Sequence, residues 1–230
     1  MTLRRIAPLR RNDEYSELEQ IRTLFLQMCV RSESMVRLAV RSVVDRDPSL
    51  GRSVVAADRE LDRLEIEIDS RCFNYLAERK PVDIELRTIT TIMKMVTDLE
   101  RIGDLSQNVA ERGLELSAGI GLEPGTDLRS MGEVAADMVR MAADAFLESS
   151  APIARELIAR DQRVDDLNRE ILQKWLAAMA AHPDQANRAL AITSMSKYIE
   201  RIADHACNLA EMVVFLVEGQ DMRHSHLTSK

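Results

Sequence analysis

Apolar residues recur at alternating intervals of three and four positions through much of the chain. One such run lies near the start: Leu18, Ile21, Phe25, Met28, Met35 and Ala39. A second lies just past the middle: Leu128, Met131, Ala135, Met138, Ala142 and Ala145. This spacing is typical of helices that bury one face against neighbouring helices. No stretch alternates with a period of two between turn residues, so nothing predicts a sheet.

Prolines and glycines lie almost entirely between long stretches rich in Ala, Leu, Met, Glu and Arg, a composition that favours helices. Four prolines stand where new helices are expected to begin: Pro48, Pro81, Pro152 and Pro183. Residues 117–126 contain three glycines and a proline and are expected to be the main linker. The chain is therefore predicted to consist of six helical arms.

The second half of the chain repeats the first. A shift of 103 residues aligns Asp58 with Asp161 and Asp62 with Asp165, and a shift of 100 residues aligns ERIGDLSQNVAE (100–111) with ERIADHACNLAE (200–211). The predicted fold is all-α, with two tandem three-helix bundles related by internal duplication. Its expected parts are a first bundle at 13–116, a linker at 117–126, a second bundle at 127–219, and flexible termini at 1–12 and 220–230.

The repeated segment carries a polar stripe along one side of the expected helix. The stripe has the same residue types in both copies: Glu100, Asp104, Asn108 and Glu111 in the first, Glu200, Asp204, Asn208 and Glu211 in the second. At about 100° per residue, Ile102, Leu105 and Val109 lie on the opposite side and are predicted to be buried. Carboxylates four residues apart on a helix repel each other by a few tenths of a kcal/mol. Their repetition therefore predicts a compensating cation or basic partner.

A hard metal ion is one candidate for that cation. Carboxylate and amide oxygens suit magnesium, calcium, manganese and iron, and the stripe itself contains no Cys or His to favour structural zinc. His205 lies near the apolar side and is expected to be partly buried rather than a ligand. The alternative is a solvated face on which Arg101 and Arg201 act as local partners. Repetition of the stripe favours the cation-binding interpretation.

Composition and charge exclude several function classes. The chain has 38 Asp and Glu against 31 Lys and Arg, a net charge of -7, which disfavours binding to nucleic acid or to anionic lipid. Three cysteines without CxxC spacing predict neither a disulfide framework nor a thiolate metal site, which fits the cytoplasm. The longest apolar run, from Trp175 to Ala181, is far too short to span a membrane. No nucleophile–base pair or phosphate loop is identifiable, so an enzyme is not expected.

These segments resemble the PhoU family of bacterial phosphate-signalling regulators, over roughly residues 15–219. The resemblance rests on the two ERIxDxxxNxAE segments, each preceded by a pair of aspartates and a Met-rich helix. It implies a cytoplasmic, often dimeric protein with metal ions on its bundle surface: iron, manganese, magnesium or zinc. The implied ligands are the two stripes, with Asp58, Asp62, Asp161 and Asp165 as second-rank candidates.

The resemblance also implies partners. These are the ATPase and permease of a phosphate ABC transporter and a membrane sensor histidine kinase, whose phosphate-starvation response and phosphate uptake the protein restrains. Membrane association is then peripheral and occurs only through the partners. Two alternatives stay open. One is a ferritin-like carboxylate-bridged metalloenzyme, disfavoured because the helical arms lack a Glu-x-x-His motif. The other is a metal-free scaffold whose stripe pairs with Arg or Lys of a partner.

Overall fold

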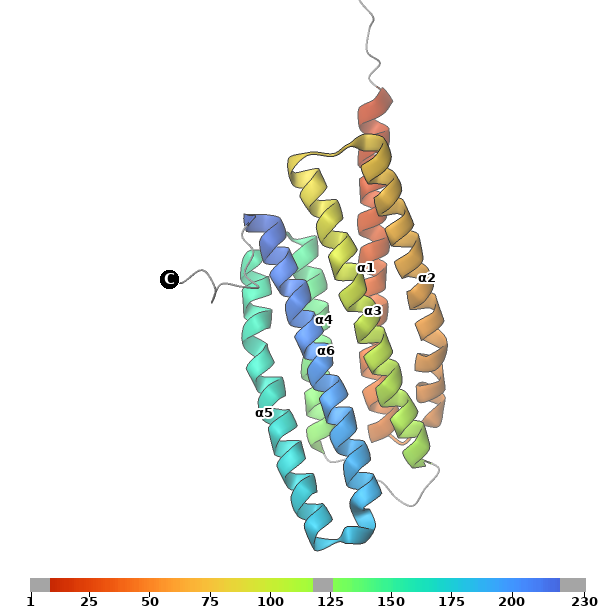
Figure 1. The fold of residues 1–230 in the computed structure, drawn as a ribbon, viewed down its shortest axis with the longest axis vertical. Coiled ribbons are helices and arrows are strands. Elements are labelled where there is room, and N and C mark those ends of the chain that lie inside the picture. Colours follow the sequence, from red (N-terminus) through yellow and green to blue (C-terminus); the bar gives the residue numbers. More distant parts are fainter. Residues whose placement is uncertain (1–8, 118–125, 220–230) are drawn as a thin grey trace, which may run out of the picture.

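The computed structural model describes residues 9–117 and 126–219, which form six α-helices and no strand (Figure 1). The helices are α1 (Leu9–Val44), α2 (Pro48–Arg79), α3 (Asp83–Ser117), α4 (Thr126–Leu147), α5 (Ala151–Ala181) and α6 (Ala186–Glu218), with a short 3-10 turn, Pro183–Gln185, before α6. The prediction of an all-α fold built from two three-helix bundles is confirmed. Residues 118–125 of the predicted linker at 117–126, residues 1–8 of the predicted flexible terminus at 1–12, and the whole predicted terminus at 220–230 lie outside the described residues.

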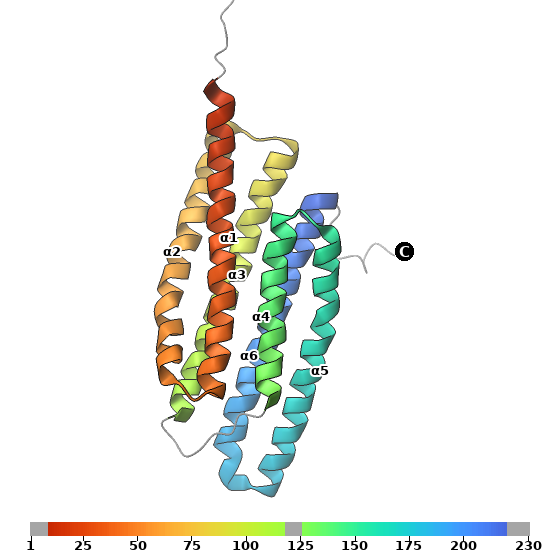
Figure 2. The ribbon, with the colours of Figure 1, turned by 180° about the vertical axis from the view of Figure 1, so that it is seen from behind.

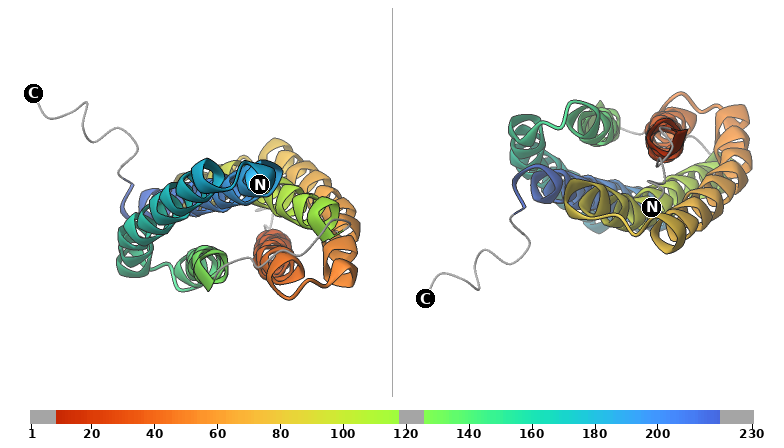
Figure 3. Two further views of the ribbon diagram at one scale, coloured as in Figure 1. Left: turned by 90° about the horizontal axis from the view of Figure 1, so that it is seen from below. Right: turned by 90° about the horizontal axis from the view of Figure 1, so that it is seen from above.

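The two bundles pack side by side. Helices α1–α3 form the first and α4–α6 the second, and they meet where α1 contacts α4 and α3 contacts α6. Figure 3 shows that α2, α3, α6 and α5 form one curved layer, with α1 and α4 on its concave side. The α2–α3 hairpin and the α5–α6 hairpin end at opposite ends of the molecule (Figures 1 and 2). We call the side of the four-helix layer that faces away from α1 and α4 the outer face.

Local sequence explains where several helices begin and end. Asp47 caps α2 by accepting a hydrogen bond from the Ser49 backbone N–H at 2.9 Å, and Pro48 occupies the first turn. Ser150 caps α5 in the same way, ahead of Pro152. Helix α6 ends at Gly219, whose φ of 73° is a left-handed conformation that glycine adopts without strain.

The predicted apolar runs form the core. Every member of the run in α4 is buried, and so are all members of the run in α1 except Leu18, which is partly buried. Phe25 of α1 packs edge-on against Phe146 of α4, with 4.6 Å between ring centroids. The same two helices approach closely at Gly132, where a Cβ atom would lie 2.4 Å from Val40 Cγ2. The core is therefore continuous across the contact between the bundles.

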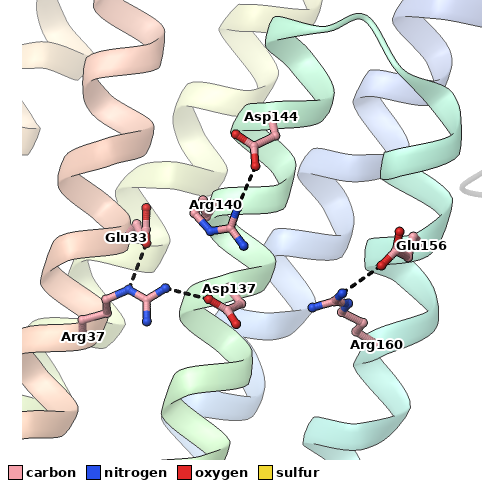
Figure 4. A network of polar contacts seen from close by, with 7 residues as sticks. All are labelled: Glu33, Arg37, Asp137, Arg140, Asp144, Glu156 and Arg160. Atoms are coloured by element: carbon pink, nitrogen blue, oxygen red, sulfur yellow. Dashed lines mark hydrogen bonds and ion pairs between the residues drawn. The ribbon is translucent and has the colours of Figure 1, made fainter.

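Charged side chains join α1 and α4 on the side of the molecule away from the outer face. Arg37 of α1 donates to Glu33 at 2.9 Å and to Asp137 of α4 at 2.7 Å (Figure 4). Arg140 pairs with Asp144 within α4. This side thus carries charges of both signs in close pairs. Among the described residues, no helix is long and apolar enough to cross a membrane.

Candidate functional site

The polar stripes face away from the core, as predicted. Ile102 and Val109 are fully buried and Leu105 is 4% exposed. Glu100, Asp104 and Asn108 are half-buried and Glu111 is exposed; in the second copy Glu200 and Glu211 are half-buried, and Asp204 and Asn208 are exposed. Each stripe therefore lies on the outer face, at the groove between the second and third helices of its own bundle.

Carboxylates of α2 join the stripe of α3. We call this group the first acidic cluster: Asp58, Asp62, Glu65, Glu100, Asp104 and Glu111. Burial and the neighbouring charges of Asp62, Asp104 and Glu111 raise the pKa of Asp58. Burial and Asp104 likewise raise the pKa of Glu100, against the opposing effect of Arg101. These carboxylates therefore lie close enough to repel one another, and the cluster favours cations or protons.

The second copy repeats the arrangement between α5 and α6. The second acidic cluster consists of Asp161, Asp165, Glu200, Asp204 and Glu211. Burial raises the pKa of Asp161, and the charges of Asp165 and Asp204 raise it further. Although Asp204 as a whole residue is exposed, partial desolvation of its carboxyl group and the charge of Glu200 raise its pKa. The predicted second-rank aspartates of both copies thus lie beside the stripes.

Cys207 lies within the second acidic cluster. Its thiol donates a hydrogen bond to Asp161. Burial and the charges of Asp161, Asp204 and Glu211 raise the pKa of this thiol, so it is protonated at neutral pH. The first copy has Gln107 at the equivalent position, where the amide donates to Glu111 at 2.8 Å. The two clusters therefore differ in one potential ligand.

Basic side chains neutralise part of each stripe. Arg101 lies 3.4 Å from Glu100 and 3.2 Å from Asp104, as the solvated-face alternative predicts. Lys197 pairs with Glu200 one turn away. Arg201, the other basic partner expected from the sequence, forms no ion pair with the part of the chain that the structure describes.

The amide of Asn208 faces the other bundle. Its Nδ2 donates to Asp98 of α3 at 3.0 Å, and His205 Nδ1 lies 2.8 Å from the same carboxylate oxygen. His205 is partly buried, as predicted. The contact places the Asn208 amide at the edge of its stripe, beside α3 rather than beside the carboxylates of α5.

The fit of these residues to a metal ion rests on their donor atoms and charge. Within residues 9–117 and 126–219, no three Asp, Glu, His or Cys side chains converge in the positions of a metal site. The carboxylates nevertheless form the oxygen-rich, mutually repelling set that hard cations bind. Arg101 is the cationic neighbour of Glu100 and Asp104 in this structure. The donor set therefore fits a hard cation by its chemistry, and the structure does not show a converged metal site in the described residues.

Sequence reasoning missed three contributors: Glu65, Cys207 and Asp98. Glu65 lies seven residues after Asp58, so helical spacing places it on the same face of α2. Cys207 is the one thiol inside a repeated segment, which marks it for inspection. Asp98 carries no such signal, because its partners lie on a helix more than 100 residues away.

Comparison with known proteins matches both halves of the chain. The family model described as PhoU domain matches residues 25–113 and 128–213. The chain is 36% identical to the phosphate-specific transport system accessory protein PhoU homolog of Pseudomonas aeruginosa, over 93% of this chain and 88% of that protein. It is 30% identical to the protein of the same name from Aquifex aeolicus, over 94% of this chain and 98% of that protein.

Solved structures show the same fold. The crystal structure of PhoU from Pseudomonas aeruginosa has a TM-score of 0.86 at 36% identity, and the match covers 90% of this chain and 99% of that one. The phosphate transport system regulatory protein PhoU from Streptococcus pneumoniae has a TM-score of 0.83 at 22% identity, over 91% and 99% of the two chains. The second likeness supports the fold alone.

Proposed function

Because the chain belongs to the PhoU family, we propose that it is a cytoplasmic accessory protein of a phosphate transport system and acts through binding rather than catalysis. The observation that carries the proposal is the family match in both halves, over most of the chain. The names of the relatives support the phosphate transport system as the partner. The outer face is the candidate contact surface, since its charged groups lie open to a partner.

The specific role that we propose is negative regulation of phosphate uptake. The protein restrains phosphate uptake by contacting the ATPase and permease of a phosphate ABC transporter, and it couples their state to a sensor histidine kinase. We also propose that it works as a homodimer and reaches the membrane only through these partners. The absence of a membrane-spanning helix in the described residues is compatible with that peripheral position.

We propose that metal ions bind at the two acidic clusters. The first cluster would hold an ion with Glu100 and Asp104, supported by Asp58 and Asp62, and the second would use the equivalent residues. A bound ion such as iron, manganese, magnesium or zinc supplies positive charge that offsets the carboxylate repulsion. The chain's own residues hold the ion and present the neutralised face to a partner.

The metal-free scaffold is the second candidate, because Arg101 and Lys197 already pair with stripe carboxylates. In that case the stripes bind Lys or Arg side chains of a partner directly. A ferritin-like enzyme has less support. Its carboxylates are directed into a bundle core, whereas these lie on the outer face.

The role in phosphate control is tested by deleting the gene in its host and restoring it with wild-type or variant chains. We expect deletion to raise phosphate uptake and a phosphate-starvation reporter in phosphate-rich medium. Wild type should reverse both, and E100Q/D104N combined with E200Q/D204N should not. E133Q/E148Q, which neutralises two exposed carboxylates of the α4 region, is the matched control. Unchanged uptake and reporter activity after deletion would contradict the proposal.

Metal binding is tested separately by elemental analysis after equilibration with Mn²⁺ or Fe²⁺ and gel filtration. We expect wild type and E133Q/E148Q to retain at least one ion per cluster, and E100Q/D104N to lose the ions of the first cluster only. Retention of no metal by wild type, together with a loss of control in the stripe variants, would favour the metal-free scaffold.

A further inference from the structure

Exposed apolar side chains accompany each acidic cluster toward the end of its hairpin. At the α5–α6 end, Leu176 is 49% exposed and Leu190 57% exposed, and Leu172 is also exposed. At the α2–α3 end, Phe73 is 61% exposed, and Leu86 is exposed as well. We call these five side chains the apolar ends. Single exposed apolar residues need no explanation, but these occur twice, on one face and next to charge.

Helical spacing places the apolar ends in the same grooves as the acidic clusters. Phe73 follows Asp62 by eleven residues and Leu176 follows Asp165 by eleven, which is about three helical turns in each case. Phe73 and Leu176 are also equivalent under the shift of 103 residues that relates the two halves. The duplication therefore preserves an exposed apolar residue at this position as well as the acidic residues.

The third helix of each bundle contributes an exposed leucine from the other side of the groove. Leu86 precedes Glu100 by fourteen residues and Leu190 precedes Asp204 by fourteen, which is again close to a whole number of turns. At the second end, Arg188 of α6 lies over the Trp175 ring of α5, with 5.7 Å from its guanidinium carbon to the ring centroid. This contact fixes α5 and α6 at the level of Leu176 and Leu190. Both walls of the groove therefore offer apolar surface there.

The antiparallel packing of α3 against α6 sets the order of these features. The α2–α3 and α5–α6 hairpins end at opposite ends of the molecule (Figure 1), and the contact of Asp98 with Asn208 brings α3 and α6 together beside their stripes. The two stripes therefore lie side by side on the outer face, and each has the apolar residues of its own hairpin further along its groove. Covering exposed leucine and phenylalanine side chains is favourable, so the apolar ends add binding free energy to charge attraction.

We propose that the outer face is a docking surface for a protein segment in which Lys or Arg side chains stand beside apolar ones, such as a basic amphipathic helix. The basic groups pair with the acidic clusters and the apolar groups cover the apolar ends. This inference rests on the proposed function in its metal-free form, in which the acidic clusters bind basic side chains directly, and it names the chemistry of the partner segment. Nucleic acid and anionic lipid are disfavoured because the clusters repel phosphate groups.

A second copy of this chain is also disfavoured on this face. Two outer faces in contact would oppose acidic cluster to acidic cluster, and like charges across an interface weaken it. The outer face is therefore expected to bind a positively charged partner segment, because its acidic clusters are negatively charged. A basic amphipathic segment and a second copy of this chain could both cover the apolar ends, and they differ in charge. The test therefore varies charge and apolar contact separately.

The test uses the full chain and a fluorescein-labelled synthetic peptide with Leu on one helical face and Lys on the other. A peptide of equal length and charge with Ser in place of Leu is the control ligand. We expect the Leu–Lys peptide to bind wild type at least tenfold more tightly than the Ser–Lys peptide, measured by fluorescence anisotropy with EDTA present. Affinity should also fall as salt rises.

Variants locate the contact. F73S/L86S and L176S/L190S are each expected to weaken the Leu–Lys peptide at least fivefold. V30S/L147S, which removes two side chains of similar exposure from α1 and α4, is expected to leave affinity unchanged. Circular dichroism confirms that all variants are folded. Equal affinity for the two peptides, or an equal loss in V30S/L147S, would overturn the proposal. So would self-association of wild type that F73S/L86S abolishes, because the face would then bind a second copy.

The peptide-binding test can fail independently of the gene-deletion test of the proposed function. If deletion of the gene changes phosphate uptake but peptide binding ignores the apolar ends, only the docking surface is wrong. If the peptide binds as expected while deletion leaves uptake unchanged, the surface stands and the phosphate role is wrong.

Discussion

Asp98 of α3 and His205 of α6 join the two bundles, with Oδ1 and Nδ1 2.8 Å apart. The same carboxylate oxygen accepts a hydrogen bond from Asn208 Nδ2 at 3.0 Å. The side chains of Asp98 and His205 are each 20% exposed, so water only partly screens the contact. It adds a specific polar link to the apolar packing of α3 against α6, and it fixes how the two stripes lie relative to each other.

The link should appear as an energetic coupling. We expect D98N and H205Q each to lower the free energy of unfolding, and the double variant to lose about 1 kcal/mol less than the sum of the single losses. Urea denaturation at pH 7 measures all three. The reason is that either single change leaves one partner without its charged or hydrogen-bonding neighbour. Strict additivity would show that the contact is not formed in solution.

Removing one carboxylate from an acidic cluster should stabilise the fold. Asp58 and Asp161 are partly buried among other carboxylates, which raises the pKa of each. D58N and D161N are each expected to raise the free energy of unfolding by about 0.5 kcal/mol at pH 7 and low salt, a figure reduced for solvent screening. Thermal denaturation measures the change, and E133Q should produce none. Loss of the gain in 1 M NaCl would confirm its electrostatic origin.

The same carboxylates predict a pH dependence. A carboxyl whose pKa is higher in the folded chain than in the unfolded one holds its proton to a higher pH when folded. Its contribution to stability therefore falls as pH rises from the unfolded value, about 4, through the raised folded value. Wild type should lose more stability than the double variant D58N/D161N over this range. Parallel pH profiles for the two proteins would contradict the assignment.

Glycine 132 allows α4 to approach α1. A Cβ atom there would lie 2.4 Å from Val40 Cγ2 and 2.7 Å from Val40 Cγ1, so G132A must push the helices apart. We expect a loss of about 1–3 kcal/mol in urea denaturation. Gly51 is the matched control, because its added Cβ would meet the Leu114 side chain at 3.2 Å and the Ala110 carbonyl oxygen at an ordinary contact distance of 3.6 Å. The better helix propensity of alanine should leave G51A near neutral.

Arg37 should matter more than Arg140, although both pair with carboxylates in Figure 4. Arg37 reaches across to Asp137 in the other bundle, whereas Arg140 pairs within its own helix. R37Q is expected to cost about 0.5–1 kcal/mol because it removes an ion pair and a link between bundles, and R140Q less than about 0.5 kcal/mol. Equal effects in thermal denaturation would show that the cross-bundle pair has no special weight.

The sequence was sufficient to predict the helices, because their apolar runs keep the period of a helix and prolines or capping residues mark several boundaries. It also predicted the direction of the stripes, since Ile102 and Val109 lie opposite the carboxylates and are buried. The sequence did not predict the contacts between helices that are distant along the chain. Spacing along one helix does not reveal that Asp98 meets His205, or that Cys207 meets Asp161. Such pairs depend on how the bundles dock.

The two like halves meet through α1 with α4 and α3 with α6, in the manner of two subunits related by a twofold axis. Each half brings its own three helices, and within the described residues the surfaces that join the halves are made of complementary apolar and charged side chains. Polypeptides ending before 118 and starting after 125 should therefore recognise each other when mixed and restore the native assembly without a peptide bond between them.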